Sequence, residues 1–344
     1  MTGLAPNTLP SIKFSEFVPR MPWWGGHLQT IANVFPPRVP ELDRYCHSCL
    51  AAPVGDGTGD RLVATLHYPA VPTPTKPVIM LIHGVGGSDD SGYMLSSAAF
   101  FLELGYPVLR CNLRGAGGSR PLCKRQYHAG SSEDLAHLIG LLPPTLAAQG
   151  VVAIAYSLGG NILLKFLGER RALAPMRGAV TVSSPLELQA TARQLSRWDN
   201  TFYQAAILAR LKSESVKPSS DVTSKDRLAI SKARTVWEFD DSFTAPRNGF
   251  SGAADYYDRS SCRQFLEAIA VPTLLIYALD DPLVPRCSYL DFEWRRNPHL
   301  VPLLSRSGGH VGFRGLDRRV AWHDRCAAQF VEALLDNCQS GTSV

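Results

Sequence analysis

The chain has 344 residues, of which 45% are hydrophobic and 19% charged, a composition typical of globular proteins rather than disordered or fibrous ones. Its net charge of +5 is not concentrated in any run of like charges, so we expect no nucleic-acid partner. No apolar stretch reaches the ~18–20 residues that span a bilayer, and the N-terminus lacks the pattern of a signal peptide. With eight dilute cysteines, these features predict a cytoplasmic protein with reduced thiols and no stable membrane insertion.

Short apolar runs alternate with helical segments from Pro77 onward, an order typical of a mostly parallel α/β sheet covered by helices on both faces. An earlier strand, 62–68, is expected at the sheet edge. The alternation of strand-like runs and helices is interrupted in 186–262, which contains helical and polar segments and which we interpret as an inserted helical cap. The organisation would then be an N-terminal arm (1–60), a core (61–185 and 263–344) and the cap. The other expected strands are 78–82, 106–113, 151–156, 178–183, 272–279 and 300–304, and the expected helices are 93–104, 135–142, 160–170, 188–198, 202–212, 288–296 and 317–335.

The strongest chemical signal is Ala155-Tyr156-Ser157-Leu158-Gly159, where an expected strand turns into a helix. A serine at such a tight turn has an exposed hydroxyl, and small residues on both sides let the flanking chains approach. Ala155 stands where glycine is usual, which weakens the motif slightly. The bare pentapeptide could be a glycine-rich turn, but the flanking strand and helix favour Ser157 as a nucleophile.

A serine nucleophile needs a histidine base and an acid that orients the base. In folds of this kind the chain order is serine, acid, histidine. Two aspartates, Asp280 and Asp281, follow the penultimate expected strand, and His310 follows the last one, flanked by glycines. Analogy favours Asp281 as the acid and leaves Asp280 as a cap or hydrogen-bonding partner. The predicted triad is therefore Ser157, Asp281 and His310.

The oxyanion formed during attack on an acyl carbon needs backbone N–H donors. The expected donors are Leu158, directly after the nucleophile, and Val85 in the glycine-rich segment 83–87. That segment fails as a dinucleotide fingerprint because Asp89 occupies the third glycine position. No histidine cluster has metal-ligand spacing, so we expect neither a metal nor a cofactor.

Several further strings of residues follow one another in order along the chain. They are Trp23-Trp24, Gly26-His27-Leu28-Gln29-Thr30, His83-Gly84-x-Gly86-Gly87-Ser88, Asn112-Leu113-Arg114-Gly115, Tyr127-His128-Ala129-Gly130, Ser157-Leu158-Gly159-Gly160-Asn161, Glu238-Phe239-Asp240-Asp241-x-Phe243-Thr244-Ala245-Pro246, Asp255-Tyr256-Tyr257 and Gly308-Gly309-His310-x-Gly312-Phe313. Together these strings resemble the YheT-like branch of the α/β-hydrolase superfamily. The resemblance implies the α/β-hydrolase fold with a helical cap, and a serine carboxylic-ester hydrolase whose small-molecule substrate is a short- or medium-chain ester or an acylglycerol-type lipid.

Alternatives remain open at this point. The same triad could transfer the acyl group to an alcohol, or the fold could have become a catalytically silent binding protein. The apolar cap residues Trp198, Phe202, Tyr203, Ile207 and Leu208 could form a wall for an acyl chain or could pack the core of the cap itself. The oligomeric state is not predictable from the sequence.

Overall fold

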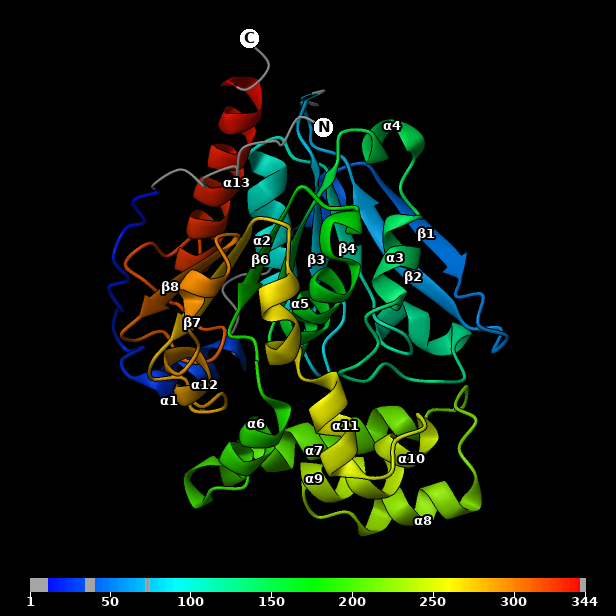
Figure 1. Cartoon of the computed structure of the whole chain (residues 1–344). Coiled ribbons are helices and arrows are strands. Elements are labelled where there is room, and N and C mark those ends of the chain that lie inside the picture. The colour runs from blue at the N-terminus through cyan, green and yellow to red at the C-terminus, as the bar shows by residue number, and fades with distance from the viewer. Residues whose placement is uncertain (1–11, 35–40, 72, 74, 341–344) are drawn as a thin grey trace.

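The computed structural model describes residues 12–34, 41–71, 73 and 75–340 of the chain. Within these ranges, one eight-stranded sheet runs in the order β1-β2-β4-β3-β5-β6-β7-β8 (Figure 1). Strands β1, β2 and β4 pair antiparallel, and all other neighbouring strands pair parallel. The strands are β1 His47–Pro53, β2 Arg61–His67, β3 Val78–Ile82, β4 Val108–Cys111, β5 Val151–Tyr156, β6 Gly178–Val182, β7 Thr273–Ala278 and β8 Leu300–Ser305.

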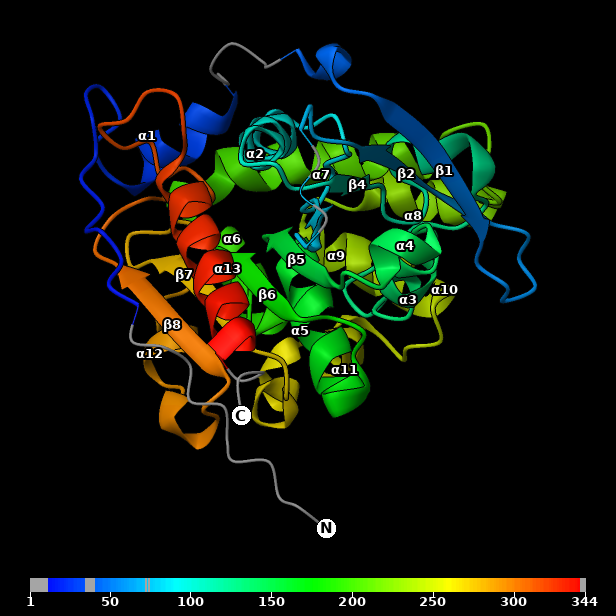
Figure 2. The same ribbon diagram turned by 90° about the horizontal axis from the view of Figure 1, so that it is seen from above.

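Helices cover both faces of the sheet, because its central strands carry apolar side chains on both faces that must be shielded from water. Helices α2 (Gly92–Glu103) and α13 (Trp322–Ser340) lie on one face, and α3 (Asp134–Ile139) and α5 (Leu158–Arg170) lie on the other (Figure 2). Alternate side chains of β3 enter two different hydrophobic clusters, one under each pair of helices. The α/β-hydrolase type of architecture expected from the sequence is confirmed.

Three expectations about single elements are wrong. The edge strand is β1, so β2 is an interior strand; β1 escaped notice because most of its side chains are exposed and give no apolar run. The expected helix 288–296 is broken into α12 (Cys287–Leu290) and a short 3₁₀ turn, Trp294–Arg296. The closing helix starts later than expected because the Asp317 carboxylate accepts the N–H groups of the next residues in a turn.

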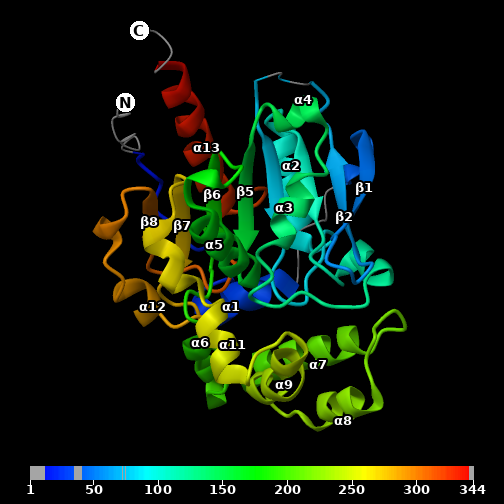
Figure 3. The ribbon, with the colours of Figure 1, turned by 45° about the vertical axis from the view of Figure 1, so that its right-hand side comes forward.

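The residues between β6 and β7 form helices that lie together beyond the carboxyl ends of the parallel strands (Figures 1 and 3). This placement supports the proposal that 186–262 is an inserted cap. Helix α1 (Gly26–Ile31) of the N-terminal segment lies at the same end of the sheet. No helix in the described ranges is long and apolar enough to cross a membrane. The cap helices are α6 Leu188–Leu195, α7 Thr201–Ser215, α8 Ser224–Lys232, α9 Val236–Phe239, α10 Ala245–Arg247 and α11 Ala253–Ser260, and the remaining short α-helix is α4 Pro144–Ala147.

Candidate active site

Ser157 occupies the turn between β5 and α5, in a backbone conformation that few residues other than glycine adopt. Its φ is 50° and its ψ is −124°, so the backbone is strained at this point. The turn is tight because the chain passes close to the loop after β3: a Cβ added to Gly159 would lie 2.3 Å from the carbonyl oxygen of His83. Ala155, where glycine is usual, is fully buried in β5. The local sequence therefore presents the Ser157 hydroxyl at the end of the sheet that faces the cap.

The structure brings Ser157, His310 and Asp281 into one hydrogen-bonded chain. The distance from His310 Nε2 to Ser157 Oγ is 2.8 Å, and that from His310 Nδ1 to Asp281 Oδ2 is also 2.8 Å. Because an ionised carboxylate only accepts, Nδ1 carries the proton and Nε2 is free to accept the serine proton. The second oxygen of Asp281 accepts the N–H groups of Leu283 and Val284, at 2.8 and 3.0 Å, which fixes the carboxylate.

Asp280 points elsewhere. Its Oδ1 accepts the N–H of Gly309 at 2.9 Å, so it supports the loop that carries His310 instead of contacting the imidazole. Between the two aspartates that the sequence left in competition, the structure places Asp281 at the histidine.

The amide N–H groups of Val85 and Leu158 have no hydrogen-bond acceptor among the described residues. The amides on either side of Val85 are occupied: Gly84 N–H donates to the Tyr93 hydroxyl at 3.0 Å, and Gly86 N–H donates to the Tyr127 hydroxyl at 2.8 Å. The two tyrosines thus fix the loop while leaving the Val85 amide available. Neither role was predicted from the sequence, although Tyr127 begins one of the strings that carry the family resemblance.

His83 begins this loop as a neutral, buried residue. Its Nδ1 donates to the carbonyl oxygen of Gly84 at 2.8 Å, and its Nε2 accepts the N–H of Leu113 at 3.1 Å. Burial lowers the pKa of His83 to about 4, so the ring stays uncharged at neutral pH. The start of the loop is therefore anchored to the segment after β4.

The N-terminal segment holds the loop that carries His310. Thr30 Oγ1 accepts the backbone N–H of His310 at 2.9 Å, and Asn33 Nδ2 donates to the His310 carbonyl at 3.0 Å. Gln29, which is fully buried, accepts the N–H of Arg314 at 2.7 Å. The sequence reasoning missed these roles. The string 26–30 was the available signal, but it gave no indication of what its residues contact.

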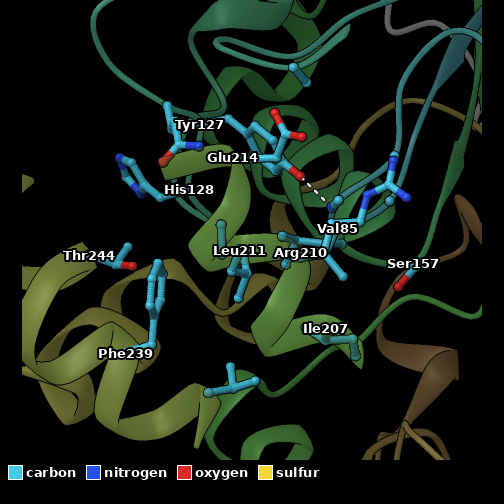
Figure 4. A pocket seen from close by; sticks show the side chains of 18 of the residues that line it. Val85, Tyr127, His128, Ser157, Ile207, Arg210, Leu211, Glu214, Phe239 and Thr244 are labelled. Carbon is cyan, nitrogen blue, oxygen red and sulfur yellow. Dashed lines mark hydrogen bonds between the residues drawn. The ribbon is translucent and has the colours of Figure 1, made fainter. Parts of the chain in front are cut away.

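A cavity of about 1040 Å³ opens between the core and the cap, and Ser157 lies on its wall (Figure 4). His310 also lines it. Phe202, Tyr203 and Ile207 line it, whereas Leu208 packs inside the cap and Trp198, 85% exposed, lies outside the lining. Leu208 therefore packs the core of the cap, Trp198 does neither, and an acyl-binding role for the three lining residues stays a prediction. Among the described residues, no group of three or more His, Cys, Asp or Glu could hold a metal ion. Further apolar lining comes from Ile31, Leu195, Leu211, Val236, Phe239 and Phe243.

Comparisons relate the chain to known proteins. A family model described as alpha/beta hydrolase fold matches residues 77–313. Over 309 residues the chain is 31% identical to YheT of Escherichia coli (strain K12), which is named as an esterase, and the match covers 88% of each protein. It is 30% identical to phospholipase ABHD3 of Mus musculus over 78% of this chain and 66% of that protein, so it spans slightly less than two thirds of the phospholipase. The solved esterase PF2001 of Pyrococcus furiosus has a similar fold, with a TM-score of 0.54 at 18% identity, over 86% of this chain and 96% of that one.

Proposed function

The chain belongs to the α/β-hydrolase fold family, in its YheT-like branch, and is a carboxylic-ester hydrolase; from this premise we propose that Ser157, His310 and Asp281 cleave acyl esters through a covalent acyl-enzyme. The observation that carries the proposal is the unbroken hydrogen-bonded chain from Asp281 through His310 to the strained Ser157, on the wall of a large cavity.

The proposed reaction has two halves. Ser157 Oγ attacks the acyl carbon while His310 Nε2 takes its proton, and the oxyanion that forms is stabilised by the Val85 and Leu158 amides. As the bond to the alcohol oxygen breaks, His310 gives the proton to that oxygen and the alcohol leaves. Water then attacks the acyl-enzyme with the same base, which releases the acid and restores Ser157. Asp281 holds the imidazole in the productive tautomer throughout.

The proposed substrates are short- or medium-chain esters or acylglycerol-type lipids. The apolar part of the cavity wall supports this class, because an acyl chain needs a surface that excludes water. The names of the relatives, an esterase and a phospholipase, support it as well. The sequence-based prediction of a cytoplasmic location stays a prediction.

Labelling with a fluorophosphonate probe tests the nucleophile directly. We expect the wild-type protein and Ser157→Ala to differ completely, because only an activated serine reacts with the probe. Ser213→Ala, which removes an exposed hydroxyl from the cap, is the matched control and should label like wild type. Equal labelling of wild type and Ser157→Ala would remove the proposed mechanism. A series of p-nitrophenyl esters of increasing chain length then defines the acyl preference, and added ethanol distinguishes hydrolysis from acyl transfer by its ethyl ester product.

A further inference from the structure

The cavity has a charged side as well as an apolar one. Its lining contains six basic and three acidic residues, so positive charge is in excess. Some of this charge is already paired within the protein, since Arg247 contacts Asp221 and Asp226, and Asp90 contacts Arg110. The basic lining residues are Arg120, Lys124, Arg125, Arg210, Lys217 and Arg247, and the acidic ones are Asp90, Glu214 and Asp240.

Arg210 is the basic residue that contacts the loop carrying Val85. It extends from α7 across Gly86, and a Cβ added to Gly86 would lie 2.8 Å from Arg210 Cδ and 2.9 Å from its Cγ. Gly86 has a φ of +64°, a conformation that favours glycine, and the absence of a side chain there leaves room for Arg210. Figure 4 shows Arg210 reaching this loop on the side of the cavity where Ser157 lies.

The guanidinium of Arg210 has no ion pair or hydrogen bond with any residue that the structure describes. Its side chain is exposed within the cavity, so its donors are available to a ligand. Burial is the main cause of the low pKa of His83, and the charge of Arg210 adds to it, which agrees with a guanidinium close to the loop. Glu214, one turn further along α7, forms no ion pair with Arg210, and its charge acts on Arg120 and Tyr127.

We propose that Arg210 is a specificity-determining residue, which makes this site select esters that carry a carboxylate or a phosphate within reach of the scissile carbonyl. The inference rests on the proposed function. A guanidinium presents a planar fork of hydrogen-bond donors that matches both a carboxylate and a phosphate. Because Arg210 lies next to the loop that carries Val85, its charge attracts an anionic ester to the site and gives a neutral ester no such advantage. The apolar wall then holds the acyl chain, so the preferred substrate is an amphiphilic anion.

Three esters with one leaving group test the preference. They are p-nitrophenyl butyrate, mono-p-nitrophenyl glutarate and p-nitrophenyl 4-(trimethylammonio)butyrate, which are neutral, anionic and cationic. For wild type we expect kcat/KM to be higher for the anionic ester than for the cationic one. The anion-to-neutral ratio should fall about tenfold in Arg210→Gln, as for a lost charged hydrogen bond, and Arg210→Lys should retain most of it. In Arg210→Glu the order of anion and cation should reverse.

Arg227→Gln is the matched control, because Arg227 is exposed on α8 outside the cavity lining and the substitution changes the net charge equally. Its ratio should equal that of wild type. In wild type itself the preference should shrink between about 0.01 and 1 M salt, a measurement that needs no variant. Equal ratios in wild type, Arg210→Gln and Arg227→Gln would exclude recognition of a carboxylate on the acyl side, and a preference that is insensitive to salt would overturn the proposal.

A second pair, 1-acylglycerol 3-phosphate and 1-acylglycerol, distinguishes a phosphate on the alcohol side from a carboxylate on the acyl side. Dependence on Arg210 in either pair supports the proposal and identifies the anion, and dependence in neither refutes it. Equilibrium binding of the same esters to Ser157→Ala measures the charge preference without turnover. If no ester is cleaved but the anions still bind through Arg210, the proposed function fails while this inference stands.

Discussion

Tyr127→Phe removes a single oxygen from the site and leaves the rest of the side chain in place. The ring retains its edge-on contact with His83, whose centroid is 5.7 Å away, so packing should be preserved. What is lost is the acceptor for the Gly86 N–H, at 2.8 Å. Because Gly86 follows Val85 directly, the substitution loosens the loop next to the proposed oxyanion donor without touching that donor.

The magnitude follows from two limits. A buried N–H without a partner costs about 1–3 kcal/mol of folding free energy. Complete loss of one oxyanion donor lowers kcat about 10²–10³-fold, which sets the upper bound. Since the Val85 amide itself remains and Tyr93 still holds Gly84, we expect kcat to fall about tenfold to 100-fold, with KM changed by less than about twofold.

The assay is steady-state hydrolysis of p-nitrophenyl butyrate, together with inhibition by an alkyl trifluoromethyl ketone that forms an oxyanion on Ser157. The inhibition constant should rise in parallel with the loss in kcat/KM, because both report binding of the oxyanion. Tyr256→Phe is the matched control: its hydroxyl accepts the Ala129 N–H at 2.8 Å, away from the loop. Both variants should lose similar stability in urea, but only Tyr127→Phe should lose ketone affinity selectively. A Tyr127→Phe enzyme that retains kcat, or that changes only KM, would refute the reasoning.

Two further predictions concern the histidines and aspartates of the site. Asp281→Asn should lower kcat about 10³–10⁴-fold, because an amide in place of the carboxylate favours the wrong imidazole tautomer. Asp280→Asn should lower it about tenfold or less, since an amide oxygen can still accept the Gly309 N–H; similar losses in the two variants would contradict the assignment. Burial lowers the pKa of His83 from 6.5 to about 4, so its contribution to stability is present above pH 6.5 and is lost as the pH falls toward 4. In wild type, the free energy of unfolding should therefore fall by up to about 3 kcal/mol more between pH 6.5 and pH 4 than in His83→Gln, as measured by urea unfolding at several pH values. If wild type and variant lose the same amount of stability over this pH range, the assignment of the pH dependence to His83 is wrong.

The central strands were predictable because they are buried on both faces and read as continuous apolar runs, as in β3 and β5. The edge strand β1 was not, because an edge strand with exposed side chains carries no such pattern. Ser157 and His310 could be picked out from the turn types around them. The choice between Asp280 and Asp281 depends on which carboxylate receives the Leu283 and Val284 amides, and this is a matter of loop conformation rather than composition.

The supports of the site were the least predictable part. Thr30 and His310 are separated by 280 positions in the sequence, and Tyr127 lies 41 positions from Gly86, whose N–H its hydroxyl accepts. Hydrogen bonds of this kind form only in the completed fold, so no local sequence pattern predicts them. The family resemblance marked the strings that contain these residues but did not say what they contact.

The contacts of Thr30 and Asn33 with His310 have a consequence for how small a working version of this enzyme could be. Both lie before the segment 77–313 that corresponds to the general hydrolase domain. A protein trimmed to that segment could retain the parallel strands of its sheet, yet the peptide groups flanking its imidazole would be left without their donor and acceptor. The support of the site therefore extends beyond the segment that the family model matches, and a shortened chain must retain Thr30 and Asn33 if the loop of His310 is to keep both of these hydrogen bonds.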